Sequence, residues 1–177
     1  MQFEYSPYIP PLLIAAIVSA IVVIYAWMRR SASGALALFV LAIFVLEWIL
    51  SYSLEIMGVG IETKYFWGVI EYIGIAFVPY GWLIFSISYS GQEQILSRRF
   101  LILTALIPSI TVLLAWTTRW HGLVWSEYHI AGQGDFSALG VSHGPWFFVH
   151  LVYSYIIILI GAFLLVRVLF RRKGMYR

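Results

Sequence analysis

The 177-residue sequence has no cysteine and few charged residues, which make up 11% of the chain. The lack of cysteine excludes a disulfide-stapled scaffold and a cysteine-ligated zinc or iron–sulfur site. The shortage of charge excludes an ordinary soluble domain, in which about a quarter of the residues are charged. Apolar residues are abundant instead: they account for 62% of the sequence, and the mean hydropathy is +0.90. This composition predicts a membrane protein.

Five apolar segments are each long enough to cross a bilayer, which takes about 20 helical residues. Backbone polar groups in lipid must be paired within the segment, so runs of this length are predicted to be helices. The sequence therefore predicts an all-α membrane protein, a single domain built as a five-helix transmembrane bundle. The predicted helices lie near residues 9–28, 35–57, 65–89, 100–118 and 146–170.

The first segment could alternatively be a cleaved signal peptide. No positive charge precedes it in residues 1–8, however, and Arg29 and Arg30 follow it. No small-residue cleavage site lies before these arginines, so an uncleaved helix is favoured.

The basic residues predict the orientation, because cytoplasmic loops are enriched in lysine and arginine. Nine basic residues lie on one predicted side of the membrane and only Lys64 and Arg119 on the other. We therefore expect the N-terminus outside, the C-terminus in the cytoplasm, and a multi-pass protein of the inner (cytoplasmic) membrane. This asymmetry explains the formal charge of +3 without a nucleic-acid partner. The nine residues are Arg29, Arg30, Arg98, Arg99, Arg167, Arg171, Arg172, Lys173 and Arg177.

The longest connection, residues 119–145, is expected outside. Residues 123–130 and 136–141 are predicted to form two short strands around a turn at residues 132–135. A hairpin would then lie over the helix ends. A flexible surface loop is the alternative.

Ionisable side chains inside a bilayer are costly, so each requires a reason. Glu47 is expected near the midplane of the second helix, and Glu71 roughly 9 Å deep in the third. His150 and Tyr153 share one face of the fifth helix at a similar depth. Trp67 lies four residues before Glu71, on the same face.

These residues could line an outward-opening pocket, with His121 and Trp125 of the long loop just above it. Aromatic rings with a few polar groups are typical of a site for an unknown small ligand. The alternative is interhelical hydrogen bonding together with an aromatic belt at the membrane interface. Glu55, near the outer end of the second helix, is expected to reach water.

Two prolines fall within predicted helices. Pro79 and Pro108 each remove one backbone hydrogen bond, which frees the carbonyls of Ile75 and Thr104. Neighbouring helices must then supply donors to these carbonyls. The prolines could mark hinges or serve packing alone.

The sequence has no nucleotide-binding loop, dinucleotide fingerprint, HExxH pair or GxSxG elbow. Ligation of a metal or haem by His121 and His150 is conceivable, but histidines in loops commonly have no such role. We therefore predict no catalytic residue, no metal site and no cofactor.

The order and spacing of polar and aromatic residues resemble a known family over nearly the whole chain. The residues that carry the resemblance are Glu47, Glu55, Lys64, Tyr65, Phe66, Trp67, Glu71, Tyr72, Gly74, Pro79, Tyr80, Gly81, Trp82, Phe85, Tyr89, Pro108, Thr117, Thr118, His121, Trp125, Gly144, Pro145, Trp146, Phe147, His150, Tyr153 and Tyr155. They resemble the seven-transmembrane input domain of histidine kinases.

The resemblance implies seven helices, followed in many members by PAS, histidine-kinase or cyclase domains. This chain has five predicted helices, and residues 174–177 resemble the loop that leads into the sixth. It is expected to be either a fragment or a natural short form. A phospho-acceptor histidine and an ATP-binding segment are absent from the sequence given, so no catalysis is expected of it.

We therefore expect a membrane-embedded sensory input domain that transmits an external or membrane signal to a cytoplasmic output outside this chain. Its expected partners are the lipid bilayer and either further copies or partner transmembrane helices. One alternative is a small integral-membrane subunit that binds partner helices, lipid or a cofactor. Another is half of a transporter, with Glu47 and Glu71 relaying protons.

The orientation can be tested with reporter fusions. Fusions after Arg30 and Arg99 are expected to report a cytoplasmic location, and a fusion near Gly134 an external one, because of the nine-to-two distribution of basic residues. A cytoplasmic signal at Gly134 would overturn the predicted topology.

Overall fold

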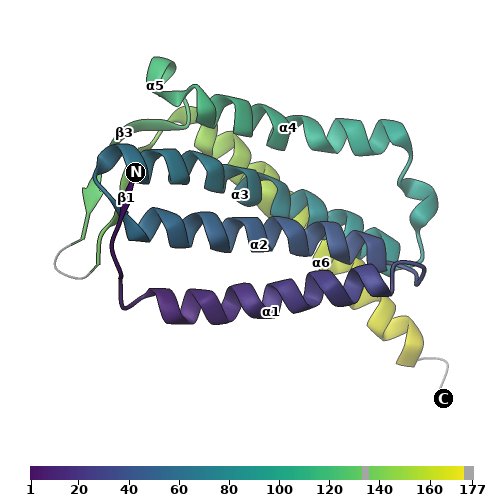
Figure 1. The fold of residues 1–177 in the computed structure, drawn as a ribbon. Coiled ribbons are helices and arrows are strands. Elements are labelled where there is room, and N and C mark those ends of the chain that lie inside the picture. Colours follow the sequence, from purple (N-terminus) through teal and green to yellow (C-terminus); the bar gives the residue numbers. More distant parts are fainter. Residues whose placement is uncertain (133–135, 174–177) are drawn as a thin grey trace.

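The computed structural model describes residues 1–132 and 136–173 and shows a bundle of long helices (Figure 1). Five of its helices are long and apolar enough to cross a membrane. The predicted five-helix, all-α membrane architecture is therefore confirmed. The long helices are α1 (Ile9–Met28), α2 (Ala35–Met57), α3 (Ile61–Tyr89), α4 (Arg98–Trp116) and α6 (Pro145–Lys173).

Short elements gather at the two ends of the bundle. At one end, β3 (Trp125–Ala131) pairs antiparallel with β4 (Ala138–His143), so the predicted hairpin is present. We call this the hairpin end. The short helix α5 (Thr118–His121) and the small sheet of β1 (Gln2–Phe3) and β2 (Gly58–Val59) also lie there (Figure 1). The 3-10 helix η1 (Glu93–Ile95) lies at the opposite end.

Two predictions fall wholly or partly on residues outside the described part of the chain. The turn expected at residues 132–135 is described only at Gly132, and the loop expected at residues 174–177 is not described.

The third helix begins earlier than the hydropathy pattern indicated. It starts at Ile61, directly after Gly60, whose φ of 82° is accessible to glycine at little cost. Lys64 therefore lies in the first turn of α3, although the sequence had placed it in a loop. The fourth helix begins at Arg98 because the Ser97 hydroxyl accepts a hydrogen bond from the Phe100 amide at 3.3 Å.

Helix α3 is the centre of the bundle. It contacts α2, α4 and α6, and it has the largest buried share of the five long helices. Helix α1 packs on α2 at the flank of the bundle (Figure 1). Any displacement of α3 therefore acts on three other helices.

Glycines allow the helices to approach closely at three points, two between α2 and α3 and one between α3 and α6. A Cβ atom at Gly74 would lie 2.6 Å from the Cβ of Trp48 on α2, and one at Gly81 would lie 3.2 Å from the Cα of Leu41. A Cβ at Gly161 of α6 would lie 2.5 Å from Nε1 of Trp82 on α3. Small residues at such contacts let membrane helices pack backbone against backbone.

The two glycines on the α2–α3 seam offer a matched pair of substitutions. We expect Gly74→Ala to destabilise the bundle by about 1–3 kcal/mol, because its new methyl group would overlap α2. Gly81→Ala is expected to be close to neutral, since its contact is longer and alanine favours a helix over glycine by about 1 kcal/mol. Thermal unfolding in detergent measures both. Equal stability of the two variants would contradict the close approach at Gly74.

Candidate functional site

A buried ion pair joins the hairpin to the helix ends. The exposed fractions of Lys64 and Glu55 are only 1% and 2%, and Nζ lies 3.7 Å from Oε1. The Lys64 ammonium donates to the carbonyls of Glu55 at 2.9 Å, Ile56 at 3.2 Å and Ser137 at 2.5 Å. Glu55 in turn accepts a hydrogen bond from the Leu139 amide. The expectation that Glu55 reaches water is therefore wrong.

We call Lys64, Glu55, Ser137 and Leu139 the hairpin clamp. The ammonium supplies donors to carbonyls in the last turn of α2, where a positive charge also complements the helix dipole. The same two side chains hold backbone groups just before and within β4. The clamp thus connects α2, α3 and the hairpin through one pair of charges.

Trp125 anchors the other strand. Its exposed fraction is 4%, and its ring packs edge-on against Tyr65 and Tyr72 of α3. The indole N–H donates to the Tyr72 hydroxyl at 3.0 Å. Thr118 of α5 accepts a hydrogen bond from the Trp125 amide at 3.0 Å. Trp125, the first residue of β3, is therefore buried in the core where the hairpin meets α3.

Glu71 and Glu47 lie on the α2–α3 seam. Glu71 accepts a hydrogen bond from the Trp48 indole at 2.7 Å. Glu47 accepts one from Ser51 at 2.8 Å, while its Oε2 atom is buried next to Gly74 and has no hydrogen-bond partner. Glu71 thus links α3 to α2.

His150 and Tyr153 belong to a different polar group, between α6 and α4. The His150 ring nitrogens lie 3.2 Å from the Thr111 hydroxyl and 3.1 Å from the Ser154 hydroxyl. The Tyr153 hydroxyl donates to the Thr104 carbonyl at 2.7 Å. This is the carbonyl that Pro108 was expected to free, and α6 supplies its donor.

The carbonyl of Ile75, which Pro79 frees, also has a neighbour on α6. The His150 imidazole interacts with the Ile75 carbonyl, so it contacts α3 as well as α4.

The remaining two predicted site residues are also separate. His121 accepts a hydrogen bond from the Leu123 amide at 3.0 Å and lies 2.9 Å from the Thr117 hydroxyl. Trp67 has a buried ring nitrogen without a hydrogen-bond partner. Within the described part of the chain, no hydrogen bond or ion pair joins Glu71 to His150, and no group of three potential metal ligands occurs. The structure therefore places Glu71 at the α2–α3 contact, and His150 and Tyr153 between α6 and α4, instead of in one cluster.

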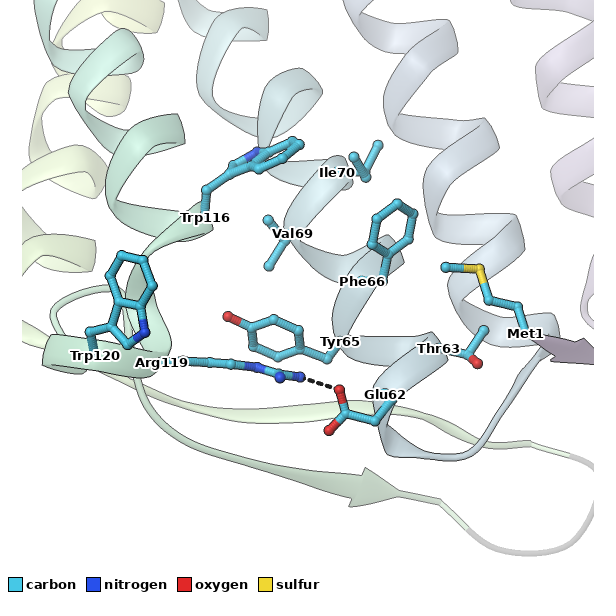
Figure 2. Close-up of a pocket in the computed structure, with 10 residues that line it drawn as sticks. All are labelled: Met1, Glu62, Thr63, Tyr65, Phe66, Val69, Ile70, Trp116, Arg119 and Trp120. Atoms are coloured by element: carbon cyan, nitrogen blue, oxygen red, sulfur yellow. Dashed lines mark hydrogen bonds and ion pairs between the residues drawn. The ribbon is translucent and has the colours of Figure 1, made fainter.

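A pocket of about 530 Å³ opens at the hairpin end between α3 and the ends of α4 and α5 (Figure 2). Its charged groups are Glu62 and Arg119, its hydroxyl groups belong to Thr63 and Tyr65, and the rest of its wall is mostly aromatic and aliphatic. None of its residues was predicted as a site residue, since they come from segments more than 40 residues apart. The pocket is lined by Met1, Glu62, Thr63, Tyr65, Phe66, Val69, Ile70, Trp116, Arg119 and Trp120.

Arg119 is held between a carboxylate and an aromatic ring. Its guanidinium pairs with Glu62 at 2.5 Å and lies 3.8 Å from the ring centre of Tyr65 (Figure 2). The hydrogen bond to Glu62 raises the pKa of Arg119 above its ordinary value, so the charge is permanent. The Tyr65 hydroxyl is buried and forms no hydrogen bond of good geometry, although the side chain and the backbone of Arg119 both lie close enough to act on it.

Comparison with known protein families gives one match, which covers residues 11–177. The matching family is described as the N-terminal 7TM region of histidine kinase. The chain belongs to this family. The match confirms the resemblance read from the sequence, and with the five apolar helices it identifies a partial seven-helix region of a multi-pass membrane protein. The family is an input region of histidine kinases rather than their catalytic domain. No curated protein and no solved structure matches the chain.

The hairpin clamp can be tested by removing its charges singly and together. We expect Lys64→Met to lower the stability by about 3–5 kcal/mol, because it leaves the Glu55 carboxylate buried without its cation. The double variant Lys64→Met with Glu55→Gln is expected to recover a large part of this loss, since glutamine is neutral and still accepts from Leu139.

Unfolding in detergent and proteolysis of the hairpin measure these changes. The exposed pair at Glu62 is the control, and Glu62→Gln is expected to change the stability by less than about 1 kcal/mol. Wild-type stability of the Lys64→Met variant would show that the clamp is not needed.

Proposed function

We propose that this chain is a sensory input region that receives a signal at its hairpin end, outside the cell, and transmits it through its helices to a cytoplasmic output. The observation that carries this proposal is the hairpin clamp. Because Lys64 and Glu55 hold the hairpin to both α2 and α3, a displacement of the hairpin acts on both helices.

The opposite end of α3 offers a route for the signal. The Ser33 hydroxyl, in the turn between α1 and α2, lies within hydrogen-bond distance of two acceptors, the Ser88 carbonyl at 3.4 Å and the Glu93 carboxylate at 3.2 Å. Gly34 of the same turn lies against the backbone of Tyr89. A shift of α3 would therefore move the α1–α2 turn. Such a switch requires a signal that binds one helix arrangement more tightly than the other.

The residues first expected to bind a ligand have a coupling role in this proposal. Glu71 links α3 to α2, and His150 and Tyr153 link α6 to α3 and α4. Trp125 and His121 hold the base of the hairpin. We also propose that these residues and Trp67 contact a ligand. They would do so when the helix contacts that now hold them open.

The alternative function is a membrane subunit that packs on partner helices or on further copies. A groove of about 590 Å³ between α4 and α6 favours it, because the groove is almost wholly apolar and its residues are largely exposed. The groove is lined by Ile107, Phe148, Val149, Val152, Tyr153, Ile156 and Ile157. Lipid or partner helices would cover this face in either function. We propose that the protein lies in the cytoplasmic membrane.

Coupling between the ends can be measured without knowing the signal. The chain lacks cysteine, so spin labels at Ser31→Cys and Arg167→Cys report the distance between the α1–α2 turn and α6 in nanodiscs. We expect the double variant Lys64→Met with Glu55→Gln to shift this distance by about 1–2 Å or more, the usual size of a helix shift.

The matched control is Glu127→Gln on the exposed face of β3, which is expected to leave the distance unchanged. A folded double variant with the wild-type distance would contradict transmission through α3 and favour the subunit function.

A further inference from the structure

We propose that the pocket of Figure 2 binds a single-chain amphiphile with a carboxylate head group, with Arg119 holding the head and the α3–α4 seam holding the tail. This inference deepens the proposed function by naming a ligand class for the hairpin end. Binding itself is measurable apart from any helix rearrangement, so either idea can fail alone.

The chemistry of Arg119 indicates that the head group of the ligand is a carboxylate. Its guanidinium is held against the Tyr65 ring and presents its donors toward Glu62 (Figure 2). A planar guanidinium binds a carboxylate through two parallel hydrogen bonds. Within the chain, the Glu62 carboxylate already accepts one hydrogen bond from Arg119, so it occupies the position that we assign to the ligand carboxylate.

Glu62 can be displaced at low cost. Its side chain is 73% exposed, and exposed ion pairs are weak because water screens them. A ligand carboxylate whose tail also leaves water would bind Arg119 more tightly than Glu62 does. Glu62 would then return to solvent, where its charge is fully hydrated.

A second donor lies in the wall of the pocket. Tyr65 is 8% exposed, and its hydroxyl is covered by other atoms, has no hydrogen-bond partner and points to the Trp120 side of the pocket (Figure 2). A buried hydroxyl without a hydrogen bond is unfavourable, so an acceptor on the ligand would relieve that cost. An oxygen of the head group would be such an acceptor once binding displaces the atoms that cover the hydroxyl.

The apolar residues that line the pocket indicate that the tail of the ligand is aliphatic. Phe66, Val69 and Ile70 of α3 face Trp116 of α4 across the pocket (Figure 2). Phe66 and Trp116 expose 41% and 53% of their surface although both are apolar. The volume of about 530 Å³ lies within the range of small-molecule sites. An aliphatic chain would cover these rings.

An aromatic belt accounts for only part of this arrangement. Exposed tryptophans at an interface anchor a protein in the membrane without binding any ligand. A belt does not explain a guanidinium fixed against a ring beside a buried hydroxyl that lacks a partner. A cationic amphiphile fits poorly, because it would approach the permanent charge of Arg119.

Equilibrium binding of radiolabelled dodecanoate to the chain in nanodiscs tests the proposal. We expect saturable binding that unlabelled dodecanoate displaces, while methyl dodecanoate and dodecyltrimethylammonium do not. Arg119→Gln is expected to weaken binding about tenfold or more, the value of a hydrogen bond to a charged group. Tyr65→Phe is expected to weaken it by about fivefold.

The decisive variant is Glu62→Gln, which is expected to tighten binding by about two- to fivefold because the competing carboxylate is gone. A misfolded variant would lose affinity and not gain it. The result for Glu62→Gln therefore remains interpretable even if Arg119→Gln folds poorly. Glu127→Gln on exposed β3 is the matched control, with unchanged affinity.

The proposal is overturned if dodecanoate does not bind saturably, if the ester or the cation displaces it equally well, or if Glu62→Gln binds no more tightly. It is also overturned if a longer protein with further helices binds no dodecanoate, since those helices would then fill the pocket at Arg119. Spin-label distances with and without dodecanoate test transmission separately.

Discussion

The ammonium of Lys64 is the group on which the hairpin end depends. A lysine in an apolar interior is unfavourable unless its charge and its donors are all paired. Here a carboxylate and three carbonyls surround it, and they come from the end of α2 and from the chain just before β4. The arrangement exists only while helices and hairpin are docked together. If the hairpin separated from α2 and α3, the buried charge would lose its partners at a large cost in free energy. This cost keeps α2, α3 and the hairpin together.

Helix α3 extends this unit through the bundle. Gly74 and Gly81 bring α2 close on one side, and Trp82 meets Gly161 of α6 on another. Between them, polar groups pair across helices: Trp48 with Glu71, and His150 with the carbonyl of Ile75. In lipid the hydrophobic effect does not drive helix association, so close packing and such pairs determine which helix faces which. A helix with so many specific neighbours is suited to carry a displacement from one end to the other.

The pocket beside the hairpin clamp contrasts with it. The Lys64–Glu55 pair is buried and its members have little freedom, whereas the Arg119–Glu62 pair is exposed and exchangeable. Tyr65 follows Lys64 directly in α3, so the clamp and the pocket share one helical turn. A ligand at Arg119 would press on the turn that also holds the hairpin. Through Glu62 and Lys64, the exposed pair and the buried pair lie within one turn of α3.

The sequence by itself determined the features that depend on local chemistry. Five apolar runs predicted five spans, because an unpaired backbone is not tolerated in lipid. Strand patterns around a turn predicted the hairpin, and the proline at position 108 predicted a free carbonyl at Thr104. The order of its polar and aromatic residues was enough to indicate the family.

Only the tertiary structure decided which side chains and which helices contact one another. These helices are apolar on every side, so their sequences do not indicate which face meets which neighbour. Depth alone grouped Glu71 with His150, whereas the rotation of each helix about its axis directs Glu71 to Trp48 and His150 to Thr111. Lys64 looked like a loop residue because its charge ended the apolar run. Its burial depends in part on the Ser137 carbonyl, which is 73 residues away in the sequence. The pocket at Arg119 likewise depends on two helix ends that only folding brings side by side.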